Sequence, residues 1–300
     1  MNKTLHIRIL KPGLHTSIQD HGRMAYRNFG VPSSGPMDKE AAILANRLVG
    51  NDRHQPVMEF ALIGPEMEIT GEGNIALTGA SFEVMLDQQN IPKNQLIAIS
   101  GKHHLRIAST RSGCWGYLSV AGSWRLPHWL NSASTSPQNS SQLTPESVIQ
   151  VGSVFEIVSG TTITPETAKP TRKKAAHIRI LPGPEYHQMS TNTVKELLSK
   201  TFTISSLRNR MGYRLVAPLS SYQNPLEIIS SGVTPGTVQI THSGQLIVLM
   251  ADGQTTGGYP RIANVISADL GELSQLNPGE SFTFKLVSLL QAYQAIESSL

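Results

Sequence analysis

Short apolar runs that end at turn-forming residues recur along almost the whole chain, and this pattern restricts the fold more than any other feature. Each run is bounded by Gly, Pro, Asn or Asp, as expected for β-strands closed by turns. The chain has 25 Gly and 18 Pro to fill the gaps. A mainly β fold is therefore predicted, built of barrels or sandwiches and not of alternating βαβ units. The runs lie at residues 5–10, 67–70, 75–78, 96–100, 105–108, 117–121, 154–158, 178–181, 236–241, 246–251 and 281–286.

A few short helices are expected beside the strands, at residues 37–49, 191–200 and 287–297. In the first, apolar side chains recur close to a 3.6-residue period, Ser34 is a candidate cap before it, and Gly50 can end it. The last has the spacing of an amphipathic helix that docks either on this chain or on a partner, and we expect docking within the chain.

The length of 300 residues and a weak internal repeat predict two domains. The run HIRIL at residues 6–10 recurs at residues 177–181. Further short matches follow in the same order and at nearly the same spacing: residues 46–49 with 213–216, 59 with 227, and 76–78 with 248–250. We therefore expect a first β-barrel domain at residues 1–165 and a second at 175–300. A linker at about 166–174, which carries Thr, Pro and a basic cluster, would join them.

The charge and the cysteine count exclude several classes of protein. The net charge of +4 results from 25 Lys and Arg against 21 Asp and Glu, and so small an excess indicates no nucleic-acid partner. No run approaches the ~20 apolar residues of a membrane-spanning helix, and no signal peptide is recognisable. The one cysteine, Cys114, allows no disulfide within the chain and is expected to be a small buried side chain. A cytoplasmic protein without a membrane partner is predicted.

Common cofactor and metal motifs do not fit. Residues 71–76, GEGNIA, match a dinucleotide fingerprint, but a strand-like run follows where that motif needs a helix. The segment is therefore predicted to be a hairpin turn. The sequence has no G-x-x-x-x-G-K-[ST] loop for ATP and no nucleophile elbow. Its ten histidines show no H-x-x-x-H or H-E-x-x-H spacing, so no metal site is predicted.

One polar segment, TSIQDHGR at residues 16–23 followed by FGVPSSGPMD at residues 29–38, is unusual for a plain barrel. Its glycines permit tight turns and a close approach of the backbone to a ligand. Arg23 is suited to bind a carboxylate or phosphate with two hydrogen bonds, and Asp38 to act as a base. The alternative is structural, with Asp38 capping the expected helix and Arg23 pairing with Asp20.

A second glycine-rich segment, ADGQTTGGYPR at residues 251–261, could hold an anion on consecutive backbone amides, beside the hydroxyl groups of Thr255 and Thr256. The alternative is a long hairpin loop on the rim of a barrel.

Several longer segments occur together in the order of one known family. They are GLHTSIQDHGRMAYRNFGVPSSGPMD, ANRLVGN, EFALIGP, ALTGA, RSGCWGYLSVAG, RMGYRL, SGVTPGTVQI and MADGQTTGGYPRIANVISADL. On these segments the chain resembles, over nearly its whole length, the KipA family of biotin-dependent carboxyltransferase-like proteins, described mainly as the C-type subunit of the prokaryotic 5-oxoprolinase. The resemblance implies two cyclophilin-like β-barrels, in agreement with the strand pattern.

The resemblance also implies a function within a complex. Family members work with a KipI-like, B-type subunit and with a lactam-utilisation, A-type subunit, and together they cleave 5-oxo-L-proline to L-glutamate with ATP. We expect this chain to be part of such a complex and inactive alone, with the nucleotide handled by another chain.

Two alternatives stay open. The chain could be a carboxyltransferase component that acts on a urea-like acceptor. Carboxybiotin would then come from another chain, since no A-M-K-M attachment segment is present. It could instead be a non-enzymatic regulator that binds a KipI-like kinase inhibitor.

Activation of a lactam or amide substrate requires donors aimed at its oxygen and a base. Asp38 is predicted to be that base, and Arg23 to anchor a substrate carboxylate. The predicted substrate-binding residues are Gln19, Asp20, Ser34 and Asn46 on one side and Thr255, Thr256 and Tyr259 on the other. Ala133 stands where the family commonly has an arginine, in a Ser-Arg-Ser-Thr segment.

Overall fold

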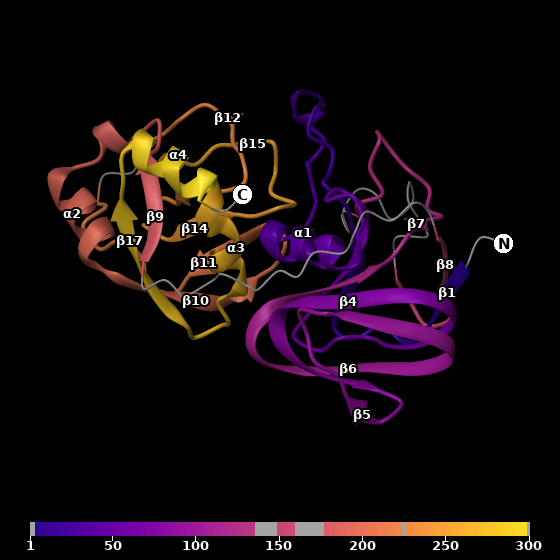
Figure 1. Cartoon of the computed structure of the whole chain (residues 1–300). Coiled ribbons are helices and arrows are strands. Elements are labelled where there is room, and N and C mark those ends of the chain that lie inside the picture. The colour runs from indigo at the N-terminus through magenta and orange to yellow at the C-terminus, as the bar shows by residue number, and fades with distance from the viewer. Residues whose placement is uncertain (1–3, 136–148, 160–176, 224–225, 299–300) are drawn as a thin grey trace. The chain divides into compact units, whose positions relative to one another are not determined.

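The computed structural model describes residues 4–135, 149–159, 177–223 and 226–298, which form two compact units. The first unit comprises Met1–Met24 and Ser34–Arg172, and the second comprises Ala25–Ser33 and Lys173–Leu300 (Figure 1). The linker predicted at residues 166–174 lies outside the described residues, so the domain boundaries stay predictions. No pattern in the sequence indicates that residues 25–33 group with the second unit.

The first unit is built on a bent sheet with the strand order β2-β3-β6-β4-β1-β8-β7, and β5 pairs with β4. Its strands are β1 (Thr4–Lys11), β2 (His15–Gln19), β3 (Val57–Ala61), β4 (Glu66–Leu86), β5 (Gln89–Asn90), β6 (Leu96–Val120), β7 (Ser123–Trp124) and β8 (Val154–Val158). Side chains alternate between core and solvent along β1, where Leu5, Ile7 and Ile9 are buried. These three belong to one hydrophobic core that includes side chains of β3, β4 and β6.

The strands β4 and β6 are much longer than the runs that the sequence shows, because both bend and continue (Figure 1). Residues 66–76 of β4 pair with the first part of β6, and residues 75–86 pair with its later part. Residues 71–76, predicted to be a hairpin turn, lie inside β4, so that prediction is wrong. Gly71 has a φ of +125°, and the carbonyl oxygen of Thr4 leaves no room for a Cβ atom there.

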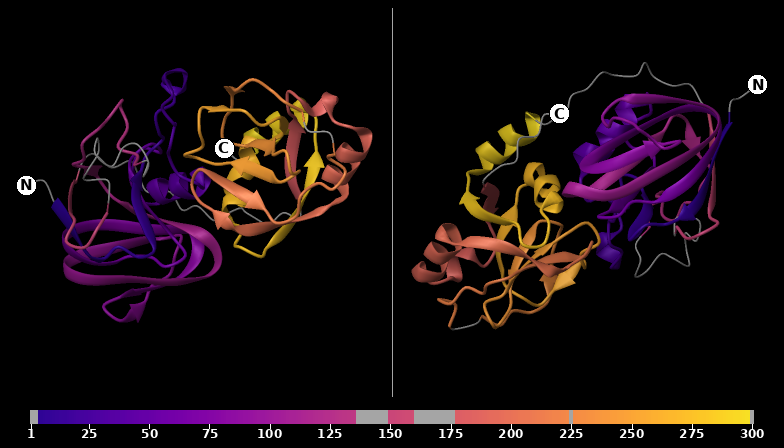
Figure 2. Two further views of the ribbon diagram at one scale, coloured as in Figure 1. Left: turned by 180° about the vertical axis from the view of Figure 1, so that it is seen from behind. Right: turned by 90° about the horizontal axis from the view of Figure 1, so that it is seen from below.

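The second unit is a closed barrel with the strand order β10-β11-β14-β13-β16-β9-β17. Its strands are β9 (His177–Pro182), β10 (Thr201–Arg208), β11 (Gly212–Leu215), β13 (Thr237–Ile240), β14 (Leu246–Leu249), β16 (Arg261–Val265) and β17 (Ser281–Leu286). The strands β9 and β17 form a parallel pair, whereas the other pairs are antiparallel. Figure 2 shows this unit from two further sides. Two short strands, β12 (Ser231–Gly232) and β15 (Thr256–Gly257), form a separate ribbon.

The helices are short: α1 (Lys39–Leu48), α2 (Thr191–Ser199), α3 (Ser267–Gln275) and α4 (Leu289–Glu297), with 3-10 turns at Arg27–Phe29 and Tyr186–Gln188. The helix α4 contacts α3 on the outside of the barrel, and its Ala292 is buried against Ile266 and Val287 (Figure 1). Docking of this helix within the chain is thereby confirmed. Leu290 and Tyr293 on its other side are exposed. Within the described ranges, no helix is long and apolar enough to cross a membrane.

The predicted fold class, mainly β with two barrel-type units and a few short helices, is confirmed. All the predicted runs coincide with strands or parts of strands, to within two residues at their ends. The sequence patterns missed β2, β3, β10, β11, β16 and α3. Two matches of the internal repeat fail. Residues 46–49 end α1 whereas residues 213–216 belong largely to β11, and Glu59 lies in β3 whereas Glu227 lies in no strand.

Replacing Gly71 by alanine is expected to destabilise the first unit by more than about 2 kcal/mol, because the new methyl group overlaps the backbone of β1 at an unfavourable φ. The matched control is Gly101→Ala. Gly101 pairs with Gly71 and also has a positive φ, +99°, but nothing lies within 4 Å of its Cβ position. Urea unfolding of the two variants measures the difference, and equal losses of stability would contradict the steric explanation.

Candidate functional site

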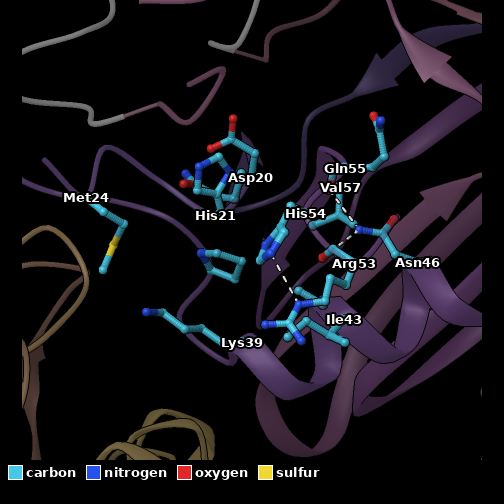
Figure 3. Close-up of a pocket in the computed structure, with 13 residues that line it drawn as sticks. Asp20, His21, Met24, Lys39, Ile43, Asn46, Arg53, His54, Gln55 and Val57 are labelled. Atoms are coloured by element: carbon cyan, nitrogen blue, oxygen red, sulfur yellow. Dashed lines mark hydrogen bonds between the residues drawn. The ribbon is translucent and has the colours of Figure 1, made fainter. Parts of the chain in front are cut away.

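A pocket of about 270 Å³ opens on the first unit, beside α1 (Figure 3). Three predicted site residues line it: Gln19, Asp20 and Asn46. Its volume is slightly below the usual range for ligand pockets, about 300–1,000 Å³, and therefore suits a small molecule. The predicted residues Arg23, Ser34 and Asp38 lie on the same two segments but do not line the pocket.

One face of α1 forms a wall of the pocket. Lys39, Ala42, Ile43 and Asn46 follow the spacing i, i+3, i+4 and i+7, which places their side chains on one side of a helix. The two positions at the ends of this stripe are polar, and those between them are apolar.

Asp38 is the N-cap of α1. Its Oδ1 atom accepts a hydrogen bond of 3.2 Å from the backbone N–H of Ala41, and the residue is 2% exposed. Capping by Asp38 was the structural alternative for this residue, and it is confirmed. The role of Asp38 as a catalytic base stays a prediction.

A buried tyrosine and a buried glutamate fix the start of α1 on the sheet. The hydroxyl group of Tyr117 accepts a hydrogen bond of 2.7 Å from the backbone N–H of Asp38 and donates one of 2.9 Å to Glu59. The same Glu59 oxygen accepts a hydrogen bond from the backbone N–H of Met37. Burial, together with the nearby carboxylates of Glu59 and Asp38, raises the pKa of Tyr117 well above its usual value. The hydroxyl group therefore stays protonated and can donate.

The carboxylate of Asp20 holds the segment 132–134 against the end of β2. Its Oδ1 atom accepts hydrogen bonds from the hydroxyl groups of Ser132 and Ser134, at 2.6 and 2.7 Å, and from the backbone N–H of Gly22. Its Oδ2 atom accepts one from the backbone N–H of Ala133 at 2.7 Å. Burial would raise the pKa of Asp20, but these hydrogen bonds outweigh that effect and lower it. Asp20 is therefore a buried anion on the floor of the pocket, and hydrogen bonds from the protein replace its hydration.

The guanidinium group of Arg23 binds the backbone of the same segment. Nη2 donates to the carbonyl oxygens of Ser134, at 2.5 Å, and Ser132, and Nε donates to that of Trp129 at 3.1 Å. The guanidinium carbon lies 4.8 Å from the centre of the Trp129 ring, and the residue is 1% exposed. This geometry supports a role in holding residues 129–134. Direct binding of substrate by Arg23 stays a prediction.

Gln19 and Asn46 are also tied into the protein. The amide nitrogen of Gln19 donates to the carbonyl oxygen of Thr135, and its oxygen accepts from the backbone N–H of Gly35. Asn46 accepts a hydrogen bond of 2.6 Å from the hydroxyl group of Ser119 and donates one of 2.8 Å to the carbonyl oxygen of Gln55. Both side chains thus help to build the pocket, and Asn46 fixes the loop after α1.

Ser34 has a positive φ of 56° and is 4% exposed. Its hydroxyl group has no hydrogen-bond partner among the described residues. A strained backbone and an unsatisfied buried hydroxyl group both cost free energy, and such costs cluster at functional sites. Binding of substrate by Ser34 stays a prediction.

Ten of the thirteen lining residues were not among those predicted, and four of these ten have basic side chains: His21, Lys39, Arg53 and His54 (Figure 3). The His21 and His54 rings make an edge contact with 5.2 Å between their centres. The Nε atom of Arg53 lies 3.2 Å from Nε2 of His54. Because arginine only donates, His54 accepts at Nε2 and carries its proton on Nδ1. A polar stretch directly after a helix, DRHQ at residues 52–55, was the available signal.

Thr255, Thr256 and Tyr259 belong to the second unit, on the segment between β14 and β16. There β15 pairs with β12, and the amide group of Gln239 donates to the carbonyl oxygen of Tyr259. The segment joins β14 to β16, and β13 lies between these two strands in the barrel, so the structural alternative of a hairpin loop is wrong. Binding of substrate by these three residues stays a prediction.

Ion-pairing and hydrogen-bonding contacts hold this segment in place. Asp252 forms a buried bidentate ion pair with Arg210, at 2.7 and 3.0 Å. Arg27 lies in residues 25–33, which group with the second unit, and it donates to the carbonyl oxygens of Val233 and Gln254. Arg27, which lies between the two runs of the first polar segment, therefore contacts the second glycine-rich segment within the second unit.

Two further expectations concern single residues. Cys114 is buried, as predicted. Ala133 is fully buried in the core of the first unit. A longer side chain at this position would have to point in another direction, because the core leaves space for a methyl group only. In the part of the chain that the structure describes, no three metal-ligating side chains come together.

Comparison with known proteins places these features in a family. Residues 29–286 match the family model described as "Carboxyltransferase domain, subdomain A and B". The chain belongs to this family. Two similar relatives are named as the C-type subunit of 5-oxoprolinase. The one from Haemophilus influenzae is 36% identical over 95% of this chain and 93% of its own length. The one from Escherichia coli is 34% identical over 96% of this chain and 94% of its own length.

A solved structure, the urea amidolyase of K. lactis, superposes on 98% of this carboxyltransferase-domain chain with a TM-score of 0.86 and 27% identity. The chain spans 19% of that much longer protein. The names of the two bacterial relatives describe them as subunits, and therefore as parts of assemblies.

The hydrogen bonds to the Asp20 carboxylate predict that acid destabilises the folded protein. Because its pKa is lower in the folded protein than the usual 3.8, Asp20 stabilises the fold above about pH 4, and this contribution disappears as the pH falls through the folded pKa. Asp20→Asn should lose about 2 kcal/mol of stability at pH 7, the scale of a hydrogen bond to a charged group, and should flatten the pH dependence. Urea unfolding at pH 7, 5, 4 and 3 measures both. The control is Asp87→Asn, at an exposed aspartate, which should lose less unfolding free energy. A pH dependence of stability that Asp20→Asn leaves unchanged would contradict the role of these hydrogen bonds.

Arg23→Lys separates a structural role from substrate binding. Lysine keeps the charge but cannot reach three carbonyl oxygens at once, so we expect a loss of about 2 kcal/mol in unfolding free energy. Arg106→Lys, at an exposed position of β6 away from the pocket, should be neutral. Unchanged stability of Arg23→Lys, combined with weaker substrate binding, would instead support Arg23 as the direct anchor.

Proposed function

We propose that this chain is the C-type subunit of an ATP-dependent 5-oxoprolinase, which opens 5-oxo-L-proline to L-glutamate. The observation that carries the proposal is the identity of 34–36%, over nearly the whole of both chains, with proteins named as that subunit. The pocket beside α1 supports it, because its volume and polar lining suit a small lactam.

The proposed reaction breaks the ring C–N bond. A water oxygen adds to the lactam carbonyl carbon, the nitrogen leaves with a proton, and hydrolysis of ATP to ADP and phosphate drives the overall change. Such a reaction needs hydrogen-bond donors at the carbonyl oxygen and a group that moves protons. The two imidazoles that line the pocket, His21 and His54, are suited to both tasks, since Nδ1 of His54 carries a proton.

The nucleotide and the other chains complete the proposal. The sequence has no phosphate-binding loop of the G-x-x-x-x-G-K-[ST] type, so we assign ATP binding to a partner. We propose a KipI-like, B-type subunit and a lactam-utilisation, A-type subunit as those partners, in the cytoplasm, where ATP is available. In this view the chain is inactive alone.

Reconstitution tests the function. We expect glutamate and ADP to form from 5-oxo-L-proline and ATP only when this chain and its A-type and B-type partners are combined. Omission of any one chain should abolish glutamate formation. Glutamate formed equally well without this chain, or none formed by the assembled complex, would overturn the proposal.

A second candidate is carboxyl transfer to a urea-like acceptor. It is favoured by the superposition on the K. lactis urea amidolyase and by the name of the family. In that case carboxybiotin arrives as a substrate on another protein. Transfer of labelled bicarbonate to urea that requires ATP, a biotinylated partner and this chain would favour this candidate over 5-oxoproline cleavage.

A further inference from the structure

The pocket beside α1 carries more positive than negative side chains. Lys39 reaches it from the first turn of α1 and Arg53 from the loop after α1 (Figure 3). Asp20 is the acidic side chain among the lining residues. The pocket therefore has a positive balance even with both of its histidines neutral.

The negative charge of Asp20 does not neutralise these cations directly. Its two oxygens accept hydrogen bonds from two serine hydroxyl groups and two backbone N–H groups, so its lone pairs are used inside the protein. Among the described residues, neither cation makes an ion pair with Asp20, and Lys39 has no hydrogen-bond or ion-pair partner.

Arg53 is held in one orientation, but not all of its hydrogen-bond donors are used. Its Nε atom donates to His54, and its backbone carbonyl oxygen accepts from Asn46, 3.5 Å away. Asn46 also holds the neighbouring Gln55, so the loop is fixed on α1. Within the described ranges, the two terminal nitrogens of Arg53 have no acceptor. They form the edge of a guanidinium group that binds a carboxylate with two parallel hydrogen bonds.

We propose that Arg53, assisted by Lys39, is the carboxylate-binding element of this pocket and selects a lactam that bears a carboxylate. The assignment rests on the proposed function, and it transfers to Arg53 the anchoring task that the sequence favoured for Arg23. Arg23 directs its Nε and Nη2 donors to backbone carbonyl oxygens, whereas the terminal nitrogens of Arg53 and the ammonium group of Lys39 have no acceptor among the described residues.

The chemistry of the ligand follows from the geometry. A carboxylate at Arg53 leaves the rest of a five-membered lactam to occupy the apolar middle of the wall, at Ala42 and Ile43, beside the two imidazoles. A neutral lactam lacks the group that these cations would bind. The pocket should therefore discriminate between 5-oxo-L-proline and 2-pyrrolidinone, the same ring without the carboxylate.

The test uses the reconstituted complex with Arg53→Gln, Arg53→Lys, Lys39→Gln and the control Arg106→Gln, an exposed arginine of the same unit outside the pocket. Arg53→Gln should raise the KM for 5-oxo-L-proline about tenfold, the effect of losing a charge-assisted bidentate contact. Arg53→Lys and Lys39→Gln should have smaller effects, and Arg106→Gln none. The Ki of 2-pyrrolidinone as a competitive inhibitor should not change in any variant, because that ligand has no carboxylate.

Two kinetic results overturn the assignment. One is a KM for 5-oxo-L-proline that Arg53→Gln leaves unchanged. The other is an equal change of that KM and of the Ki for 2-pyrrolidinone, since this indicates altered packing and not a lost charge contact. Thermal unfolding of each variant excludes a general loss of structure, and Arg53→Lys serves where Arg53→Gln does not fold.

Direct titration separates this inference from the proposed function. If the wild-type complex forms no glutamate, the function fails, and calorimetry on the full chain decides the inference alone. Binding of 5-oxo-L-proline that is weakened about tenfold by Arg53→Gln, with inorganic phosphate binding no more tightly, supports a carboxylate site. Absence of 5-oxo-L-proline binding, or binding of phosphate alone, overturns it.

Discussion

The buried carboxylate of Asp20 is the interaction on which the pocket depends. A buried charge costs several kcal/mol unless hydrogen bonds replace its hydration, and here two hydroxyl groups and two backbone N–H groups do so. Three of these donors lie more than a hundred positions away in the chain, so the carboxylate joins the end of β2 to the segment 132–134. Arg23 binds the carbonyl oxygens of the same segment, and together the two side chains satisfy a stretch of backbone that forms no regular strand.

The polar residues of the pocket therefore fall into two groups, those that bind other parts of the protein and those that can bind a ligand. Gln19, Asp20 and Asn46 spend their polar atoms on the protein and fix the shape of the pocket. The residues at the rim, above all Lys39 and Arg53, keep their donors for a ligand. A site built in this way is preorganised, because binding does not have to break the hydrogen bonds that hold its walls.

The regular parts of the fold were predicted well, whereas the candidate site was not. Alternating apolar side chains and turn residues located β1, β8, β9 and β17, and helical spacing located α1, because these signals are local. The strand β2, HTSIQ, escaped because it lacks the alternating apolar side chains that mark the other strands. Its buried Gln19 donates to the carbonyl oxygen of Thr135, a distant partner that no local pattern indicates. The motif around residues 16–38 pointed to Gln19 and Asp20, which line the pocket, but no local pattern reveals that they form hydrogen bonds with other parts of the protein. Arg53 looks in the sequence like an ordinary exposed side chain, and only the fold brings it to the pocket.

The central claim is that Arg53, and not Arg23, meets the carboxylate of the substrate. Nuclear magnetic resonance of the arginine Nε–H groups in the full chain, titrated with 5-oxo-L-proline, tests it most directly. The Arg53 signal, assigned through its loss in Arg53→Lys, should shift on binding, while the Arg23 signal should stay in place because its partners are backbone carbonyl oxygens. A shift of the Arg23 signal with an unchanged Arg53 signal would contradict the account.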